Sequence, residues 1–93
     1  MMDYEQKFPC ACCRYLTRSS GEPGTFEICP ICYWEEDRLQ EEQPTLSGGS
    51  NQVSLEKGRT NFLAFGACEQ SFQEFCRGPN QSEMTIIRKK IDY

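Results

Sequence analysis

CACC at residues 10–13 and CPIC at residues 29–32 decide the fold of this chain. Fifteen residues, 14–28, separate the two doublets. This spacing is typical of a metal site, because each doublet places two thiolates on one tight turn and the connection lets the turns meet. Four thiolates around one ion form the closed tetrahedral arrangement of structural zinc. We therefore expect a metal centre whose ligands are Cys10, Cys13, Cys29 and Cys32.

Cys12 lies inside the first doublet and leaves alternatives open. It could replace Cys10 or Cys13 as a ligand, or the chain could hold no metal. Iron is an alternative to zinc, because sites made of four thiolates accept both metals. A redox dithiol is a further alternative, but it calls for a thioredoxin-like βαβ pattern that flanks neither doublet.

The length and composition favour a small domain that a metal stabilises. Ninety-three residues make a single domain, 1–93, and a core of that size is marginally stable without added support. There is no histidine, which removes the commonest general base and the commonest ligand of an open catalytic zinc site. We expect a closed structural site and no enzymatic activity.

The distribution of cysteine and apolar residues bears on location. The first seven residues contain no apolar core of a signal peptide. The seven cysteines are an odd number, and four of them have metal-ligand spacing rather than a disulfide framework. No stretch approaches the length of a transmembrane helix. These observations predict a cytoplasmic protein without a membrane partner.

The charge pattern suggests where a partner would bind. The chain carries a net charge of −4, and residues 22–42 hold seven acids and one base. A nucleic-acid-binding protein should show a basic stripe instead. We expect acidic side chains that face water beside aromatic side chains near the metal. The candidate partner-binding residues are Tyr33, Trp34, Glu35, Glu36 and Asp37.

The rest of the chain predicts an α+β fold. Residues 14–17 and 25–28 have strand character and flank a Pro/Gly turn. We expect them to pair as a zinc-ribbon hairpin within 8–37, with two metal-binding turns. A loop at 38–53, a helical segment at 54–78 and a tail at 79–93 should follow. The tail contains Ile86, Ile87 and Ile91, so it could form a last strand or dock against the domain. It also contains the basic run 88–90.

Two helices are expected in the helical segment. Ser54 is a suitable N-cap and Gly66 a suitable C-terminal cap for the first. Leu55, Phe62 and Leu63 recur with helical spacing and should form its apolar face. The second should run from 68 to 76, with Cys68 and Cys76 as small apolar residues. Core aromatic side chains are expected at Phe62, Phe65, Phe72 and Phe75.

The residue after each doublet should adopt a left-handed conformation. In zinc turns this place usually holds glycine, because backbone N–H groups fold back toward the sulfurs. Here Arg14 and Tyr33 occupy it. A non-glycine residue at positive φ costs on the order of 1 kcal/mol.

Three blocks of the sequence together resemble a known family. Residues 8–15 are similar to Y-P-C-P-C-C-G-Y, and residues 26–37 to Y-E-I-C-P-V-C-F-W-E-D-D. Residues 48–55, 61–62 and 65–67 are similar to G-G-x-N-x-V-S-L…N-F…F-G-A. These are motifs of the bacterial cysteine-rich CPCC proteins. This sequence departs from them at Ala11 and Arg14, where Pro and Gly are expected.

The resemblance implies a bacterial zinc ribbon without a catalytic residue. Similar small acidic proteins lie beside toxin genes, which implies an immunity or antitoxin-like role. The first hypothesis is therefore a non-catalytic zinc-binding module that binds a protein partner. The alternatives are a nucleic-acid-binding zinc-ribbon regulator and, less favoured, a thiol redox protein. The sequence carries no signal for the oligomeric state.

Overall fold

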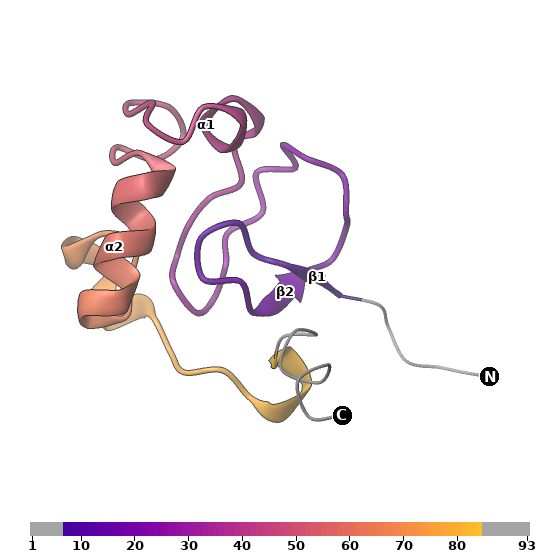
Figure 1. Ribbon diagram of the computed structural model, residues 1–93. Helices are drawn as coiled ribbons and strands as arrows, with labels where there is room; N and C mark the ends of the chain where they lie inside the picture. The colour runs from indigo at the N-terminus through magenta and orange to yellow at the C-terminus, as the bar shows by residue number, and fades with distance from the viewer. Residues whose placement is uncertain (1–6, 85–93) are drawn as a thin grey trace, which may run out of the picture.

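A computed structural model describes residues 7–84 of the chain. Two short strands, β1 (Phe8–Pro9) and β2 (Leu16–Arg18), form an antiparallel hairpin. The helices are α1 (Arg38–Glu42) and α2 (Leu55–Phe65), followed by two 3-10 helices, η1 (Gln70–Phe75) and η2 (Gln81–Glu83). In Figure 1, α2 and η1 lie on one side of the cysteine-bearing loops, and the chain then runs beneath these loops to η2. The elements are compatible with the expected α+β class.

The predicted pairing of 14–17 with 25–28 is wrong. Strand β2 pairs instead with β1, across the first doublet, with Phe8 opposite Arg18. Ile28 forms an isolated antiparallel bridge with Glu35, across the second doublet. Each doublet therefore closes its own small loop. Such local contacts cost less chain entropy than the longer hairpin.

Side chains, rather than a β ladder, hold the connection between the doublets. Arg18 donates through Nε to Glu36 Oε2 at 2.7 Å and through Nη2 to the Glu22 carbonyl at 2.8 Å. The Thr25 hydroxyl donates to Glu36 Oε1 at 2.9 Å. Phe26 has a φ of 61°, which no regular strand accommodates. These contacts explain why 25–28 does not extend alongside β2.

The segment 38–53, which was expected to be a loop, begins with α1. The side chain of Asp37 caps this helix by accepting from the Gln40 amide at 3.1 Å. Gln40 is fully buried. Its side-chain amide donates to the carbonyls of Leu46, Asn51 and Val53, and its carbonyl oxygen accepts from Asn51. One polar side chain thus organises most of the following loop.

Gly49 is required by the close approach of this loop to α1. A Cβ atom there would lie 2.8 Å from Asp37 Oδ2 and 2.9 Å from the Gln40 side chain. Neither group moves freely, because Asp37 caps the helix and Gln40 holds the loop.

We predict that Gly49→Ala lowers the unfolding free energy by about 1–3 kcal/mol, the usual cost of overpacking. Gly78→Ala is the matched control, because a Cβ there meets no atom within 4 Å. Chemical denaturation at a fixed free zinc concentration measures both. Equal stability of the two variants would contradict the crowding at Gly49.

Helix α2 has the predicted caps. Ser54 Oγ accepts from the Lys57 amide at 3.1 Å, and Gly66 ends the helix at a φ of 83°. The predicted apolar face is only partly right, because Leu55 is 1% exposed but Leu63 is 87% exposed. The helix packs instead through Leu55 and Gly58, which are both buried, and a Cβ atom at Gly58 would lie 3.5 Å from the Trp34 ring.

The second predicted helix, 68–76, is shorter and of the 3-10 type. Cys68 is buried as expected, but it precedes η1. Phe75 is 55% exposed, and the other three phenylalanines of the expected core are half-buried. The core consists instead of sulfur and a few large side chains: Cys10, Cys12, Cys13, Cys29, Ile31, Cys32, Trp34, Leu55 and Cys68.

The tail is described only as far as Met84. An Asn80 capping box begins η2, and Arg77 forms an ion pair with Glu83 at 2.7 Å. The expectations for Ile86, Ile87, Ile91 and the run 88–90 lie outside the described residues. No helix between residues 7 and 84 has the length and apolar character that a membrane crossing requires.

Candidate metal centre

The first doublet forms a tight turn, here called knuckle 1 (residues 10–15). The Cys10 amide donates to the Tyr15 carbonyl, and the Arg14 amide donates to the Cys10 carbonyl, both at 2.9 Å. The Cys12 amide points at Cys10 Sγ, 3.3 Å away. Arg14 has a φ of 72°. The backbone therefore wraps around the Cys10 sulfur and supplies it with a hydrogen-bond donor.

The second doublet repeats this arrangement in knuckle 2 (residues 29–34). The Cys29 amide donates to the Trp34 carbonyl at 3.0 Å, and the Tyr33 amide donates to the Cys29 carbonyl at 2.8 Å. The Ile31 amide lies 3.4 Å from Cys29 Sγ, and Tyr33 has a φ of 71°. The predicted left-handed conformation after each doublet is therefore confirmed at both positions.

We predict that Arg14→Gly raises the unfolding free energy. The side chain of Arg14 is exposed, so its removal relieves strain at positive φ without loss of packing. Relief of the strain stabilises the folded state, whereas the greater freedom of glycine stabilises the unfolded chain by a smaller amount. The net gain in unfolding free energy is about 0.5–1 kcal/mol. Arg14→Ala keeps the Cβ atom and should leave stability unchanged. If Arg14→Ala raised the unfolding free energy as much as Arg14→Gly does, backbone strain at this position would be excluded as the cause.

The two knuckles bring four sulfurs together. The Sγ atoms of Cys10, Cys13, Cys29 and Cys32 lie within 4.8 Å of one another, and all four residues are buried. Cys10 and Cys32 Sγ are 3.6 Å apart, and Cys13 and Cys29 Sγ are 3.8 Å apart. A disulfide would require about 2.05 Å. Zn–S bonds of about 2.3 Å give a tetrahedron with edges of about 3.8 Å, so the four sulfurs fit such an ion.

The electrostatics of the four thiols also favour a cation. Contact with the thiols of Cys10, then Cys13 and Cys32, and with the Thr17 hydroxyl, lowers the pKa of Cys29. The pKa of Cys10 is lowered chiefly by hydrogen bonding with Cys13. Hydrogen bonding with Cys10 and with Cys29 raises the pKa of both Cys13 and Cys32, and Cys10 is the largest cause for each. Four thiolates cannot coexist here without a positive ion, and a divalent metal would supply that charge.

A family model described as Cysteine-rich CPCC matches residues 8–83. The chain belongs to this family. The match spans both knuckles and every helix between residues 7 and 84. No curated protein matches this CPCC chain.

Cys12 is not part of the four-sulfur cluster of this CPCC protein. Its amide supports the Cys10 sulfur, which is the role that Ile31 has in knuckle 2. Its side chain is 4% exposed and packs in the core beneath α2. Because the two knuckles have the same backbone arrangement, Cys12 occupies a position of the turn that does not supply a metal ligand.

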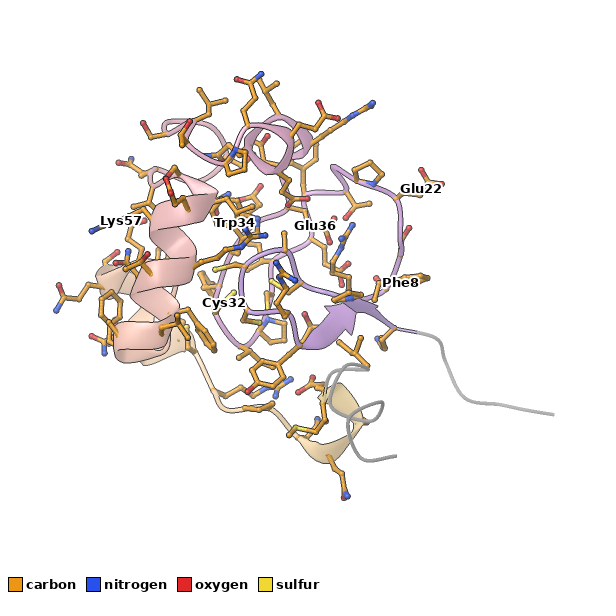
Figure 2. The ribbon with its side chains drawn as sticks, viewed as in Figure 1. Phe8, Glu22, Cys32, Trp34, Glu36 and Lys57 are labelled. Carbon is orange, nitrogen blue, oxygen red and sulfur yellow. The ribbon has the colours of Figure 1, made fainter. Side chains whose placement is uncertain are left out.

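Two of the five candidate partner-binding residues lie in the interior of the protein rather than at its surface. Trp34 is fully buried and Glu36 is 3% exposed, so neither can contact a partner. Figure 2 shows Trp34 and Cys32 on the side of the cysteine-bearing loops that faces α2, whereas Glu22 points outward. Glu36 faces Arg18 rather than water, because a buried carboxylate needs a partner of opposite charge.

The other three candidates are partly exposed and have structural contacts. Tyr33 packs against Phe72, with ring centroids 5.0 Å apart. The Glu35 amide donates to Asn51 Oδ1 at 2.9 Å, and Asp37 caps α1. These five residues therefore hold the fold together more than they form a free surface.

Three supporting contacts around the centre were missed in the sequence. Arg59 Nε donates to the Ala11 carbonyl at 3.0 Å and so ties α2 to knuckle 1. The Cys68 amide donates to the Cys32 carbonyl at 2.8 Å, and Asn61 Nδ2 donates to the Cys68 carbonyl at 2.9 Å. In the sequence, the Asn-Phe motif at 61–62 was the one indication of these contacts. Together they fasten the helical segment onto both knuckles.

Proposed function

We propose that this CPCC protein is a non-catalytic zinc-binding module whose metal holds a zinc-ribbon-like fold. The observation that carries the proposal is the closed cluster of four buried sulfurs at tetrahedral spacing. A catalytic zinc keeps one position for water or substrate, whereas four thiolates leave none. Zinc is preferred to iron because structural zinc is the commoner occupant of such sites inside cells.

Metal analysis tests this proposal directly. The purified chain should contain one zinc per molecule, and a Co2+-substituted form should show charge-transfer bands of a four-thiolate site. If protein produced with both metals available contained iron instead of zinc, the assignment of zinc as the cofactor would be wrong. Steady turnover of a substrate at the metal would contradict a non-catalytic role.

We further propose a protein partner with a basic surface, in an immunity or antitoxin-like role in the bacterial cytoplasm. The support is the excess of acids in residues 22–42. On α1, Leu39 is 52% exposed and Glu42 is exposed beside it. The loop that carries Glu22 lies against this helix, because a Cβ at Gly24 would be 3.1 Å from Arg38 Cβ. Exposed acidic side chains such as Glu22 and Glu42, although Glu42 also pairs with Arg38 at 3.1 Å, speed association with a basic partner.

Binding to the product of the neighbouring gene tests the partner and its contact surface. Leu39→Asp should weaken binding at least tenfold, whereas Leu63→Asp on α2, also at an exposed leucine, should leave it unchanged. Glu42→Gln should slow association at low salt. Equal effects of the two leucine variants would rule out α1 as the contact. Absence of binding by the wild type would reject this partner and leave the zinc proposal standing.

A further inference from the structure

Thr17 contributes a buried hydroxyl beside the metal centre. It is the middle residue of β2 and is 8% exposed. Successive side chains of a strand point to opposite faces, so Thr17 faces inward between Leu16 and Arg18, which are both half-buried. The Thr17 amide donates to the Tyr15 carbonyl at 2.9 Å, and Arg18 is fixed by its ion pair with Glu36. The chain therefore holds the Thr17 side chain in place from both sides.

The hydroxyl of Thr17 lies against the sulfur of Cys29. Thr17 Oγ1 is 3.3 Å from Cys29 Sγ, and between residues 7 and 84 this hydroxyl has no other hydrogen-bond partner. A buried hydroxyl without a good partner is costly, and valine has the same branched shape without that cost. A neutral thiol is a weak acceptor, whereas an ionised acceptor forms a strong hydrogen bond. A hydroxyl therefore suits this position when Cys29 is a thiolate.

The direction of this hydrogen bond follows from metal binding. A cysteine sulfur that binds a metal has lost its proton. The sulfur can then only accept, so the Thr17 hydroxyl is the donor. The Ile31 amide also points at Cys29 Sγ, at 3.4 Å. Cys29 thus has one donor from its own knuckle and a second from β2.

The residue equivalent to Thr17 after the second doublet has a different role. Thr17 follows its doublet by four residues, and Glu36 follows the second doublet by four. The Glu36 carboxylate binds Arg18 at 2.7 Å and the Thr25 hydroxyl at 2.9 Å, rather than a sulfur. The backbone donors of the two knuckles repeat, but this side-chain donor does not, which distinguishes Cys29 from the other ligands.

We propose that Thr17 is a positioning residue of the metal centre, whose hydroxyl donates to the Cys29 thiolate and fixes that sulfur in place. The hydrogen bond joins β2, which follows knuckle 1, to a ligand of knuckle 2. Loss of such a supporting contact typically weakens metal binding by about 10–100-fold. This inference rests on the proposed zinc site and adds a residue that the spacing of the doublets does not reveal.

Zinc affinity of the full-length chain is the first measurement, for the wild type, Thr17→Val, Thr17→Ser and Thr25→Val. Valine removes the hydroxyl, whereas serine keeps it. Thr17→Val should bind zinc about tenfold more weakly than the wild type, and Thr17→Ser within about threefold. Thr25→Val is the matched control, because the Thr25 hydroxyl donates to Glu36 and not to a sulfur. It should also stay within about threefold. Competition with a chromophoric chelator under reducing conditions measures these affinities.

Co2+ absorption separates this role from packing. All four proteins keep four thiolates, so their charge-transfer bands should have equal intensity. A hydrogen bond to sulfur lowers the energy of the sulfur lone pairs. The band of Thr17→Val should therefore move to longer wavelength, while Thr17→Ser and Thr25→Val keep the wild-type position. Saturating Co2+ favours the folded, metal-bound state of every variant by mass action.

The band position decides between the outcomes. A Thr17→Val protein with the wild-type band position would overturn the inference even if its zinc affinity fell, because packing alone can lower affinity. Equal shifts for Thr17→Val and Thr17→Ser would also overturn it, since the hydroxyl would not be the cause. A wild type that binds neither metal would instead reject the proposed function itself, and this inference with it.

Discussion

Cys29→Ser is expected to abolish folding at ordinary free zinc concentrations. Cys29 Sγ lies 3.8 Å from Cys13 Sγ, accepts from the Ile31 amide and lies 3.3 Å from the Thr17 hydroxyl, so it is the most supported of the four sulfurs. Structural zinc sites contribute roughly 10–16 kcal/mol of apparent binding free energy, and that energy is folding energy. A domain of this size has a total stability of about 5–15 kcal/mol. Loss of one ligand therefore removes most of what holds the chain folded.

Zinc content and circular dichroism measure this effect. The variant should retain far less than one zinc per chain and show no cooperative thermal transition. Cys76→Ser is the control, because Cys76 is half-buried, donates to the Phe72 carbonyl at 3.3 Å and lies outside the four-sulfur cluster. It should keep one zinc and melt within a few degrees of the wild type. A Cys29→Ser protein that holds zinc and melts cooperatively at the wild-type temperature would contradict the ligand role.

Trp34→Ala is expected to lower the unfolding free energy by about 3–5 kcal/mol, the usual cost of removing a fully buried large aromatic side chain. Trp34 is 0% exposed and packs where Gly58 brings α2 close to knuckle 2. Its indole N–H donates to Glu41 Oε2 at 3.0 Å, and that same oxygen accepts from the Asp37 amide at 3.1 Å. The ring therefore joins the metal centre, α2 and the start of α1.

The zinc site itself should survive this change, because no ligand is altered. Denaturant unfolding at fixed free zinc, together with zinc content, separates packing from metal loss. Trp34→Phe keeps most of the packing and removes the hydrogen bond, so it should cost only about 1–2 kcal/mol. A loss below about 1 kcal/mol for Trp34→Ala would show that the indole is not central to the core.

Local features of the metal centre could be predicted from the sequence. Each knuckle is closed by hydrogen bonds that span no more than five residues, such as Arg14 to Cys10. The spacing within a doublet therefore determines its turn, including the positive φ at Arg14 and Tyr33. The caps of α2 at Ser54 and Gly66 were predictable for the same reason.

Features that depend on contacts between distant segments could not be predicted. The strand pairing depends on Arg18, which reaches the buried Glu36 eighteen residues away. In the sequence, Glu36 is one of a run of acids, and nothing there marks it as buried. Gln40 and Asn51 read as ordinary loop residues, yet their side chains hold 38–53 together. Leu63 fits the helical spacing of an apolar face, but this short helix packs through Gly58 instead.

Removal of the metal tests the central claim most directly. The purified chain is titrated with a strong chelator under reducing conditions, while bound zinc and circular dichroism are followed together. The account predicts one zinc per chain, and loss of the folded signal in proportion to zinc removed, with recovery when zinc is restored. A chain that contains no metal, or that stays folded and melts cooperatively after all zinc is removed, would contradict it.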